Sequence, residues 1–274
     1  MESNARRNHP RHSGNHFLVW LAAIVVLVIL GACLVHGLPA FRNRGLDTTS
    51  DQTAETAGRG QSDKEEGDDT PGLSLKQTAA YPRLKSSVDY DKDGIDDYTD
   101  LVQGAHEGAE RHRKYDTGYY QGGYPPDDRG ACTDEIWRDF SHAGYDLKAM
   151  VDADIAANPT AYSGVITRPD PNIDFRRTNV LGVFFGRYAQ ELTTDTAAHD
   201  QWQQGDIVIF DTSWHIGMVS DRRDKQGVPL LLHNMAQKHR ENDYLGSDSH
   251  RIITGHFRFD ASRIPQSVLK PWNG

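Results

Sequence analysis

The stretch that decides the fold is GDIVIFDTSWHIGMVSDRRDKQGVPLLLHN, residues 205–234. Its runs of isoleucine, valine and leucine are separated by turn-forming residues, a pattern typical of β-strands joined by hairpins. A further run of the same kind, ITGHFRF at 253–259, follows near the C-terminus. The pattern predicts an antiparallel sheet in this half of the chain.

Two histidines in this stretch are expected to be neighbours. The turn at 221–227 is centred on Asp224, and a hairpin with that centre and no bulge places His215 directly opposite His233. Directly opposite residues lie on one face of a sheet with Cβ atoms about 4.5–5.5 Å apart. Asn234 is expected to point to the other face, because successive strand residues alternate.

The sequence before the sheet has helical periodicity. A helix is predicted over 99–114, and a second is predicted to begin at Cys132, with Ile136 and Phe140 on its apolar face. Asp146 can cap a third helix. Helices first and an antiparallel sheet afterwards predict an α+β fold in which the N-terminal helices pack on the sheet.

The chain has two cysteines, Cys33 and Cys132. Cys33 falls in an apolar N-terminal run, so Cys132 is expected to be a lone thiol. The start of a helix favours a thiolate, whereas Asp134 and Glu135 in the first turn oppose it. A histidine would supply the cation that the thiolate needs. The alternative is that Cys132 is a small buried apolar residue.

These residues predict a nucleophilic site without a cofactor. Cys132 is the expected nucleophile, His215 the base, and His233 the group that fixes the ring and tautomer of His215. Backbone N–H groups at Cys132 would form part of an oxyanion hole. Each histidine taken alone is more often a surface or satisfied core residue, so the prediction depends on the three residues coming together.

An acidic loop precedes the first predicted helix. In DYDKDGIDDYTD, residues 89–100, carboxylates stand at positions 1, 3, 5, 9 and 12, and a glycine stands at position 6. This spacing suits Ca²⁺, which takes 6–8 oxygen ligands. The loop resembles the repeats of thrombospondin type 3 more than an EF-hand. The alternative is a solvated acidic run before a helix. The candidate ligands of a structural Ca²⁺ are Asp89, Asp91, Asp93, Ile95, Asp97 and Asp100.

The N-terminal part predicts export. Residues 1–16 are polar and expected to be cytoplasmic, whereas 17–37 contain an apolar run long enough for a transmembrane signal anchor in the inner membrane. Residues 38–87 are rich in Asp, Thr, Ser and Gly and are predicted to be a disordered linker. The folded domain is expected at 88–270. In the alternative, Cys33 is the lipidated cysteine of a lipobox-like sequence. Each version places the domain in the bacterial cell envelope.

The charge of the chain disfavours one class of partner. There are 30 basic and 39 acidic residues, which gives a formal net charge of −9. No stripe of Lys and Arg interrupts this acidic balance, so no nucleic acid is expected as a partner. Arg176 and Arg177, in PDPNIDFRR, are expected either to hold a substrate carboxylate or to belong to a structural network with aspartates.

The motifs also resemble known families. The order GACTDEIWRDF, GDIVIF, HIGMVS and LLHN is similar to the NlpC-type cysteine peptidases, and YDTGYYQGGYPPDDRGACTDEIWR with RPDPNIDFRRTNVL resembles the YijF-like envelope proteins. The NlpC resemblance implies a papain-like fold with Cys132, His215 and His233 as catalytic residues. It also implies Tyr119, three residues before Gly122, as an oxyanion contact. The chain reads Ala-Cys-Thr where those enzymes usually read Asp-Cys-Ser.

The expected function is therefore a membrane-anchored cysteine amidase or endopeptidase of the cell envelope, whose partners are peptidoglycan stem peptides. One alternative is a non-catalytic, calcium-stabilised envelope-binding module. Another is a thiol acyltransferase that uses the same cysteine.

Overall fold

A computed structural model describes residues 80–247 and 250–274. The predicted cytoplasmic segment, the signal anchor, Cys33 and most of the predicted linker lie outside these residues. In the part of the chain that is described, no helix is long and apolar enough to cross a membrane.

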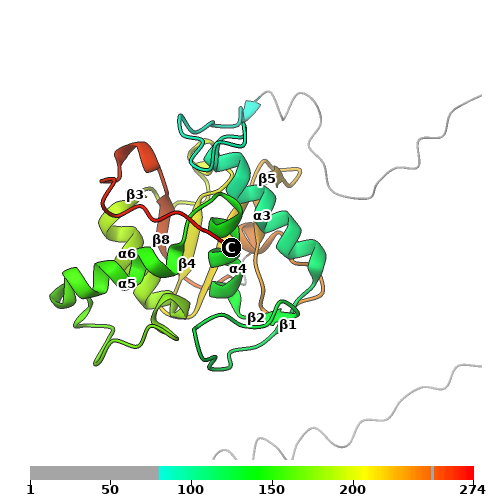
Figure 1. The fold of residues 1–274 in the computed structure, drawn as a ribbon. Helices are drawn as coiled ribbons and strands as arrows, with labels where there is room; N and C mark the ends of the chain where they lie inside the picture. Colours follow the sequence, from blue (N-terminus) through cyan, green and yellow to red (C-terminus); the bar gives the residue numbers. More distant parts are fainter. Residues whose placement is uncertain (1–79, 248–249) are drawn as a thin grey trace, which may run out of the picture. The chain divides into compact units, whose positions relative to one another are not determined.

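Within the described residues, four α-helices come before the main sheet (Figure 1): α3 (Asp97–Arg111), α4 (Cys132–His142), α5 (Leu147–Ala157) and α6 (Thr178–Tyr188). The helix predicted to begin at Cys132 is α4, and the side chain of Asp146 caps α5 by accepting a hydrogen bond from the N–H of Ala149 at 2.8 Å. Helix α6 was not anticipated from the sequence. A short parallel pair, β1 (Lys114–Tyr115) and β2 (Arg129–Gly130), lies between α3 and α4.

The main sheet has six strands in the order β3-β8-β4-β5-β6-β7, and every pair in it is antiparallel. The α+β prediction is thus confirmed. The strands are β3 (Gln190–Glu191), β4 (Ile207–Phe210), β5 (His215–Arg223), β6 (Pro229–Leu232), β7 (Glu241–Asn242) and β8 (Ile253–Arg258).

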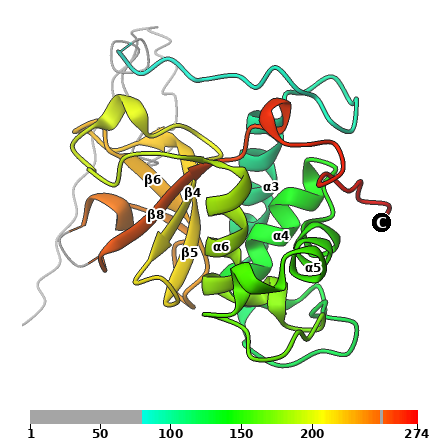
Figure 2. The ribbon, with the colours of Figure 1, turned by 90° about the vertical axis from the view of Figure 1, so that its left-hand side faces the viewer.

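The helices pack on one face of this sheet (Figure 2). Ile207, Ile209 and Ile216 of the sheet join Ile136 and Phe140 of α4 in the larger apolar core. A smaller apolar cluster, which includes Trp202, Val208, Phe210, Val219 and Leu231, covers the opposite face. Alternate residues of β4 and β5 therefore supply two separate cores, as the strand period of two requires.

The β5–β6 hairpin differs from the predicted register. Met218 lies opposite Leu232, so Gly217 rather than His215 faces His233 across the strands. Arg223 lies opposite Pro229, so the turn is centred two residues later than predicted, and an irregularity between Val219 and Arg223 recovers only part of the offset, which leaves a net shift of two residues. A shift of two keeps each side chain on its predicted face. His215 and His233 are consequently diagonal neighbours instead of direct partners.

The last residues of the predicted linker pack on the domain. The N–H of Leu84 donates to Oε1 of Gln203 at 3.0 Å, and Arg83 pairs with Asp221 at 2.7 Å. The Arg223 guanidinium lies over the ring of Tyr81, 4.7 Å from its centroid. Residues 81–84 of the predicted linker are thus in contact with the domain that was expected to begin at position 88.

Candidate active site

The start of α4 is held by a buried ion pair. The Asp134 carboxylate accepts a hydrogen bond from the N–H of Ala131 at 2.6 Å and two more from Arg176, at 2.5 and 2.9 Å. Arg176 also donates to the carbonyl of Gly118 at 2.7 Å, and its guanidinium lies over the ring of Tyr120. Both charged side chains are buried. Arg176 therefore fixes the start of α4 and the neighbouring loop, which is the structural role predicted as the alternative for this arginine.

The Cys132 thiol is the first side chain of α4 and is 6% exposed. Burial raises the pKa of this thiol to about 11, although hydrogen bonds from the backbone N–H groups of Ile216 and Thr133 and from Thr178 act in the opposite direction. Desolvation therefore exceeds the stabilising effect of the helix start, and the resting residue is a neutral thiol at pH 7.

The two imidazoles form a hydrogen-bonded chain with an asparagine. Nε2 of His215 lies 2.8 Å from Nδ1 of His233, and Nε2 of His233 lies 3.1 Å from Oδ1 of Asn242. The same Oδ1 accepts the N–H of Tyr244, and the Asn242 amide nitrogen donates to the carbonyl of His239, so the orientation of this amide is defined by its partners. The predicted contact between the two rings is present.

This chain assigns a tautomer to each ring. An acceptor oxygen at Asn242 requires the proton of His233 on Nε2, and Nδ1 of His233 is then an acceptor. His215 must in turn carry its proton on Nε2, which leaves its Nδ1 unprotonated. Burial lowers the pKa of His215 to about 3 and that of His233 to about 4, with the neighbouring ring acting in the same direction on His215. Both rings are therefore neutral at pH 7.

The sulfur and the rings approach the same point of β5 from different sides. Cys132 belongs to the core between helices and sheet, next to Ile216. The His215 ring stacks on Phe210, with centroids 5.9 Å apart, and meets Tyr244 edge-on at 6.1 Å, both on the opposite face. No hydrogen bond joins the sulfur to either ring among the described residues. The structure thus brings the two histidines together and places the cysteine beside the residue that follows His215.

The structure does not bring Tyr119 to the thiol. Its hydroxyl lies 3.1 Å from Oδ2 of Asp170 and 2.7 Å from the amide nitrogen of Asn172, and the side chain is 58% exposed. A tyrosine that sequence reasoning missed is closer: burial and the charge of Cys132 both raise the pKa of Tyr115. Tyr115 ends β1, whose pairing with β2 beside Cys132 had no sequence signal.

The acidic loop gathers some of its predicted ligands. Carboxylate oxygens of Asp89, Asp91 and Asp93 lie within 4.8 Å of one another. Asp93 also accepts the N–H of Ile95 at 2.8 Å. Asp97 turns elsewhere, because its two oxygens accept the N–H of Tyr90 at 2.9 Å and the hydroxyl of Tyr145 at 2.6 Å. Asp97 is therefore committed to the protein and does not belong with the other predicted ligands.

Comparison with known proteins places these residues in a family. A family model described as "Domain of unknown function (DUF1287)" matches residues 102–259, a range that includes Cys132, His215 and His233 but not the acidic loop. The chain is 36% identical over 158 residues to "Uncharacterized protein YijF" of Escherichia coli (strain K12), over 53% of this chain and 73% of that protein. No solved structure matches. The predicted relationship to YijF-like proteins is confirmed, and the chain belongs to the DUF1287 family.

Proposed function

We propose that this protein is a cysteine hydrolase with a papain-like site, in which Cys132 is the nucleophile and His215 the base. The observation that carries the proposal is the chain from His215 through His233 to Asn242. This chain keeps the His215 imidazole neutral, with Nδ1 available as a proton acceptor. His215 directly precedes Ile216, whose backbone N–H contacts the Cys132 sulfur. General-base catalysis starts from a neutral thiol and a neutral base, and the bound substrate would have to lower the pKa of Cys132 and raise that of His215 for the proton to move.

The proposed reaction has two balanced steps. In the first step, which requires the thiol to leave its place beside Ile216 and come within reach of His215, Sγ of Cys132 attacks the carbonyl carbon of an amide while Nδ1 of His215 takes the thiol proton. The imidazolium then gives this proton to the leaving amine, so a thioester and a free amine form. Water next attacks the thioester through the same base, which releases the carboxylic acid and restores the thiol. His233 keeps the His215 ring in its tautomer throughout.

The proposed substrate is a peptide of the cell envelope. Two features of the sequence support it: the order of the nucleophile, base and third-residue motifs resembles the NlpC-type enzymes, and the N-terminal sequence predicts export. We therefore propose peptidoglycan stem peptides as the substrate class and the cell envelope as the site of action, with the inner membrane contacted by the N-terminal segment.

One observation favours a second function. The sulfur and the rings belong to different faces of the sheet, and burial opposes charge on all three groups. This arrangement also suits a non-catalytic envelope-binding module in which Cys132 is a core residue.

Mass spectrometry of muropeptides incubated with the full chain separates the two functions. The hydrolase releases cleaved stem peptides, and both Cys132→Ala and His215→Ala lose at least about a thousandfold in rate. His112→Ala, an exposed histidine at the end of α3, is the matched control and retains the rate. Alkylation of Cys132 by iodoacetamide adds a second readout, because only the hydrolase makes this rate depend on His215. Intact peptides together with alkylation independent of His215 would establish the binding module.

A further inference from the structure

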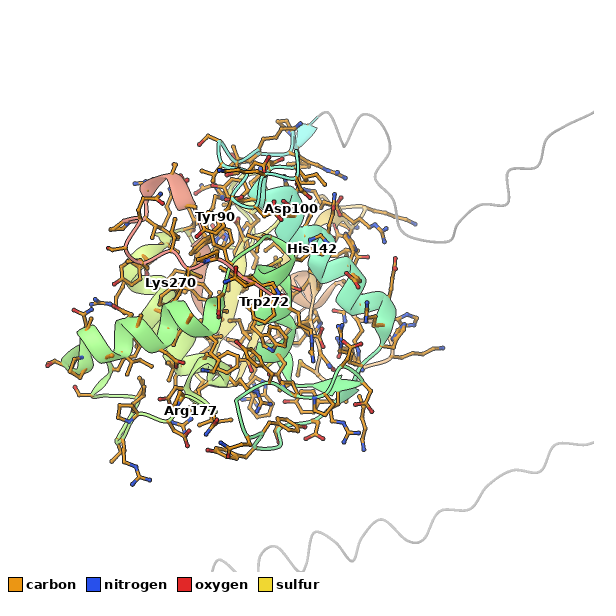
Figure 3. All side chains as sticks on the ribbon, in the orientation of Figure 1. Tyr90, Asp100, His142, Arg177, Lys270 and Trp272 are labelled. Carbon is orange, nitrogen blue, oxygen red and sulfur yellow. The ribbon has the colours of Figure 1, made fainter. Side chains whose placement is uncertain are left out.

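The first turn of α3 contains a buried carboxylate without a partner. Asp100 is 1% exposed, and neither of its oxygens has a hydrogen-bond partner. An ionised carboxylate in this position costs several kcal/mol unless it is paired or binds a metal. Asp100 is labelled on the N-terminal half of α3 in Figure 3.

The charges that act most strongly on Asp100 belong to other carboxylates. Burial, followed by the charges of Asp93, Asp91, Asp97 and Asp89, raises the pKa of Asp100 to about 7. Every charged group among these largest causes is a carboxylate. The cluster therefore concentrates negative charge around an oxygen pair that the protein leaves unpartnered.

The loop around Asp100 has the backbone of an ion-binding turn. Lys92 has a φ of 66°, so the chain turns sharply between Asp91 and Asp93. Gly94 has a φ of +99°, which turns the chain again between Asp93 and the start of α3. The N–H groups of Asp93 and Gly94 donate to the two oxygens of Asp89 at 3.1 and 3.0 Å, which fixes the orientation of that side chain. Backbone hydrogen bonds thus help to bring the carboxylates at positions 1, 3 and 5 together.

We infer that residues 89–100 bind one Ca²⁺ through the carboxylates of Asp89, Asp91, Asp93 and Asp100 and the backbone carbonyl of Ile95. The oxygens of Asp89, Asp91 and Asp93 lie within 4.8 Å of one another, which matches oxygens on opposite sides of an ion with bonds of about 2.3–2.6 Å. With Asp100 bidentate, the chain supplies six oxygens, the lower limit for Ca²⁺. Asp97 is not a ligand but stabilises the loop, because its carboxylate accepts hydrogen bonds from both Tyr90 and Tyr145.

The ion would connect the N-terminal segment to the helical layer. Asp91 packs against Gly144, where an added Cβ would lie 2.6 Å from the Cβ of Asp91. The ring of Tyr90, inside the loop, stacks on that of Tyr145 with centroids 4.1 Å apart. A loop neutralised by Ca²⁺ therefore holds the start of α3 against the turn between α4 and α5. This inference is independent of the proposed hydrolase activity.

Calorimetry and thermal melting of the full chain test the site, with calcium chloride as the probe after treatment with a chelator. We expect binding of one ion per chain and a rise in Tm of roughly 5 °C at saturating Ca²⁺. Asp100→Asn should abolish this rise and also raise the Tm of the calcium-free protein, because it removes an unpartnered buried charge. A merely structural role of Asp100 predicts a lower Tm instead.

Two further variants keep the inference falsifiable. Asp91→Asn, at an exposed position, should weaken Ca²⁺ binding at least about tenfold even if Asp100→Asn fails to fold. Asp128→Asn removes a carboxylate paired with Arg129, outside the loop, and should leave the calcium-dependent rise intact. No heat of binding at about 5 mM Ca²⁺, several times the dissociation constant of about 1 mM for the weakest extracellular sites, or an affinity unchanged by Asp91→Asn, would overturn the assignment.

Discussion

Two buried carboxylates in this domain have opposite surroundings, although both lie in the first turn of a helix. Asp134 in α4 accepts two hydrogen bonds from Arg176 and one from the backbone. Asp100 in α3 accepts none and faces other carboxylates. The carboxylate at the start of α4 is therefore satisfied by groups of the protein itself, whereas the inferred Ca²⁺ would satisfy the carboxylate at the start of α3.

The strongest way to break this comparison is to make Asp134 resemble Asp100. Arg176→Met leaves Asp134 buried without its cation, and we expect a loss of about 3–5 kcal/mol in the free energy of unfolding. Chemical denaturation measures this loss. Arg187→Met is the control, since its partner Asp154 keeps hydrogen bonds from Tyr162 and Tyr188 and should lose less. Equal losses of unfolding free energy in the two variants would show that the Arg176–Asp134 pair stabilises the fold no more than the Arg187–Asp154 pair.

The buried histidine pair, unlike the two carboxylates, predicts how the stability of the fold depends on pH. The folded pKa values of about 3 for His215 and about 4 for His233 lie below the unfolded value near 6.5. Between about pH 6.5 and 4 the unfolded chain binds protons that the folded chain does not, so stability falls as pH falls. Each ring contributes up to about 1.4 kcal/mol per pH unit in this window.

His215→Gln measures that contribution directly. Denaturation at pH 7 and pH 5 should show a smaller loss for the variant than for the wild-type chain, at saturating Ca²⁺ so that the acidic loop does not interfere. An unchanged difference between the two pH values would mean that His215 is not held neutral by burial.

Much of the fold could be read from local patterns. The apolar spacing after Cys132 predicted α4, Asp146 marked the start of α5, and the β-rich runs predicted β4, β5, β6 and β8. Helix α6 could not be predicted in this way, because Gly182 and Gly186 interrupt a run of valine and phenylalanine that has no clear helical period.

The site was predicted where it depended on strand faces and missed where it depended on loops. A register shift of two residues left His215 and His233 on one face, so their contact survived an error in pairing. Spacing from Gly122 selected Tyr119, but the loop path places Tyr115 nearer the thiol. Position 9 of the acidic loop selected Asp97, yet a tyrosine more than forty residues away binds it instead. Such long-range partners have no local signal.

The tautomer of His215 is the central claim, because it decides which nitrogen can accept the Cys132 proton. Nitrogen NMR of histidine-labelled protein at pH 7, with His215 assigned by His215→Gln, reads the protonation of each ring nitrogen. We expect His215 and His233 both protonated on Nε2 and unprotonated on Nδ1. A proton on Nδ1 of His215, or a cationic His215 ring, would contradict the proposed base.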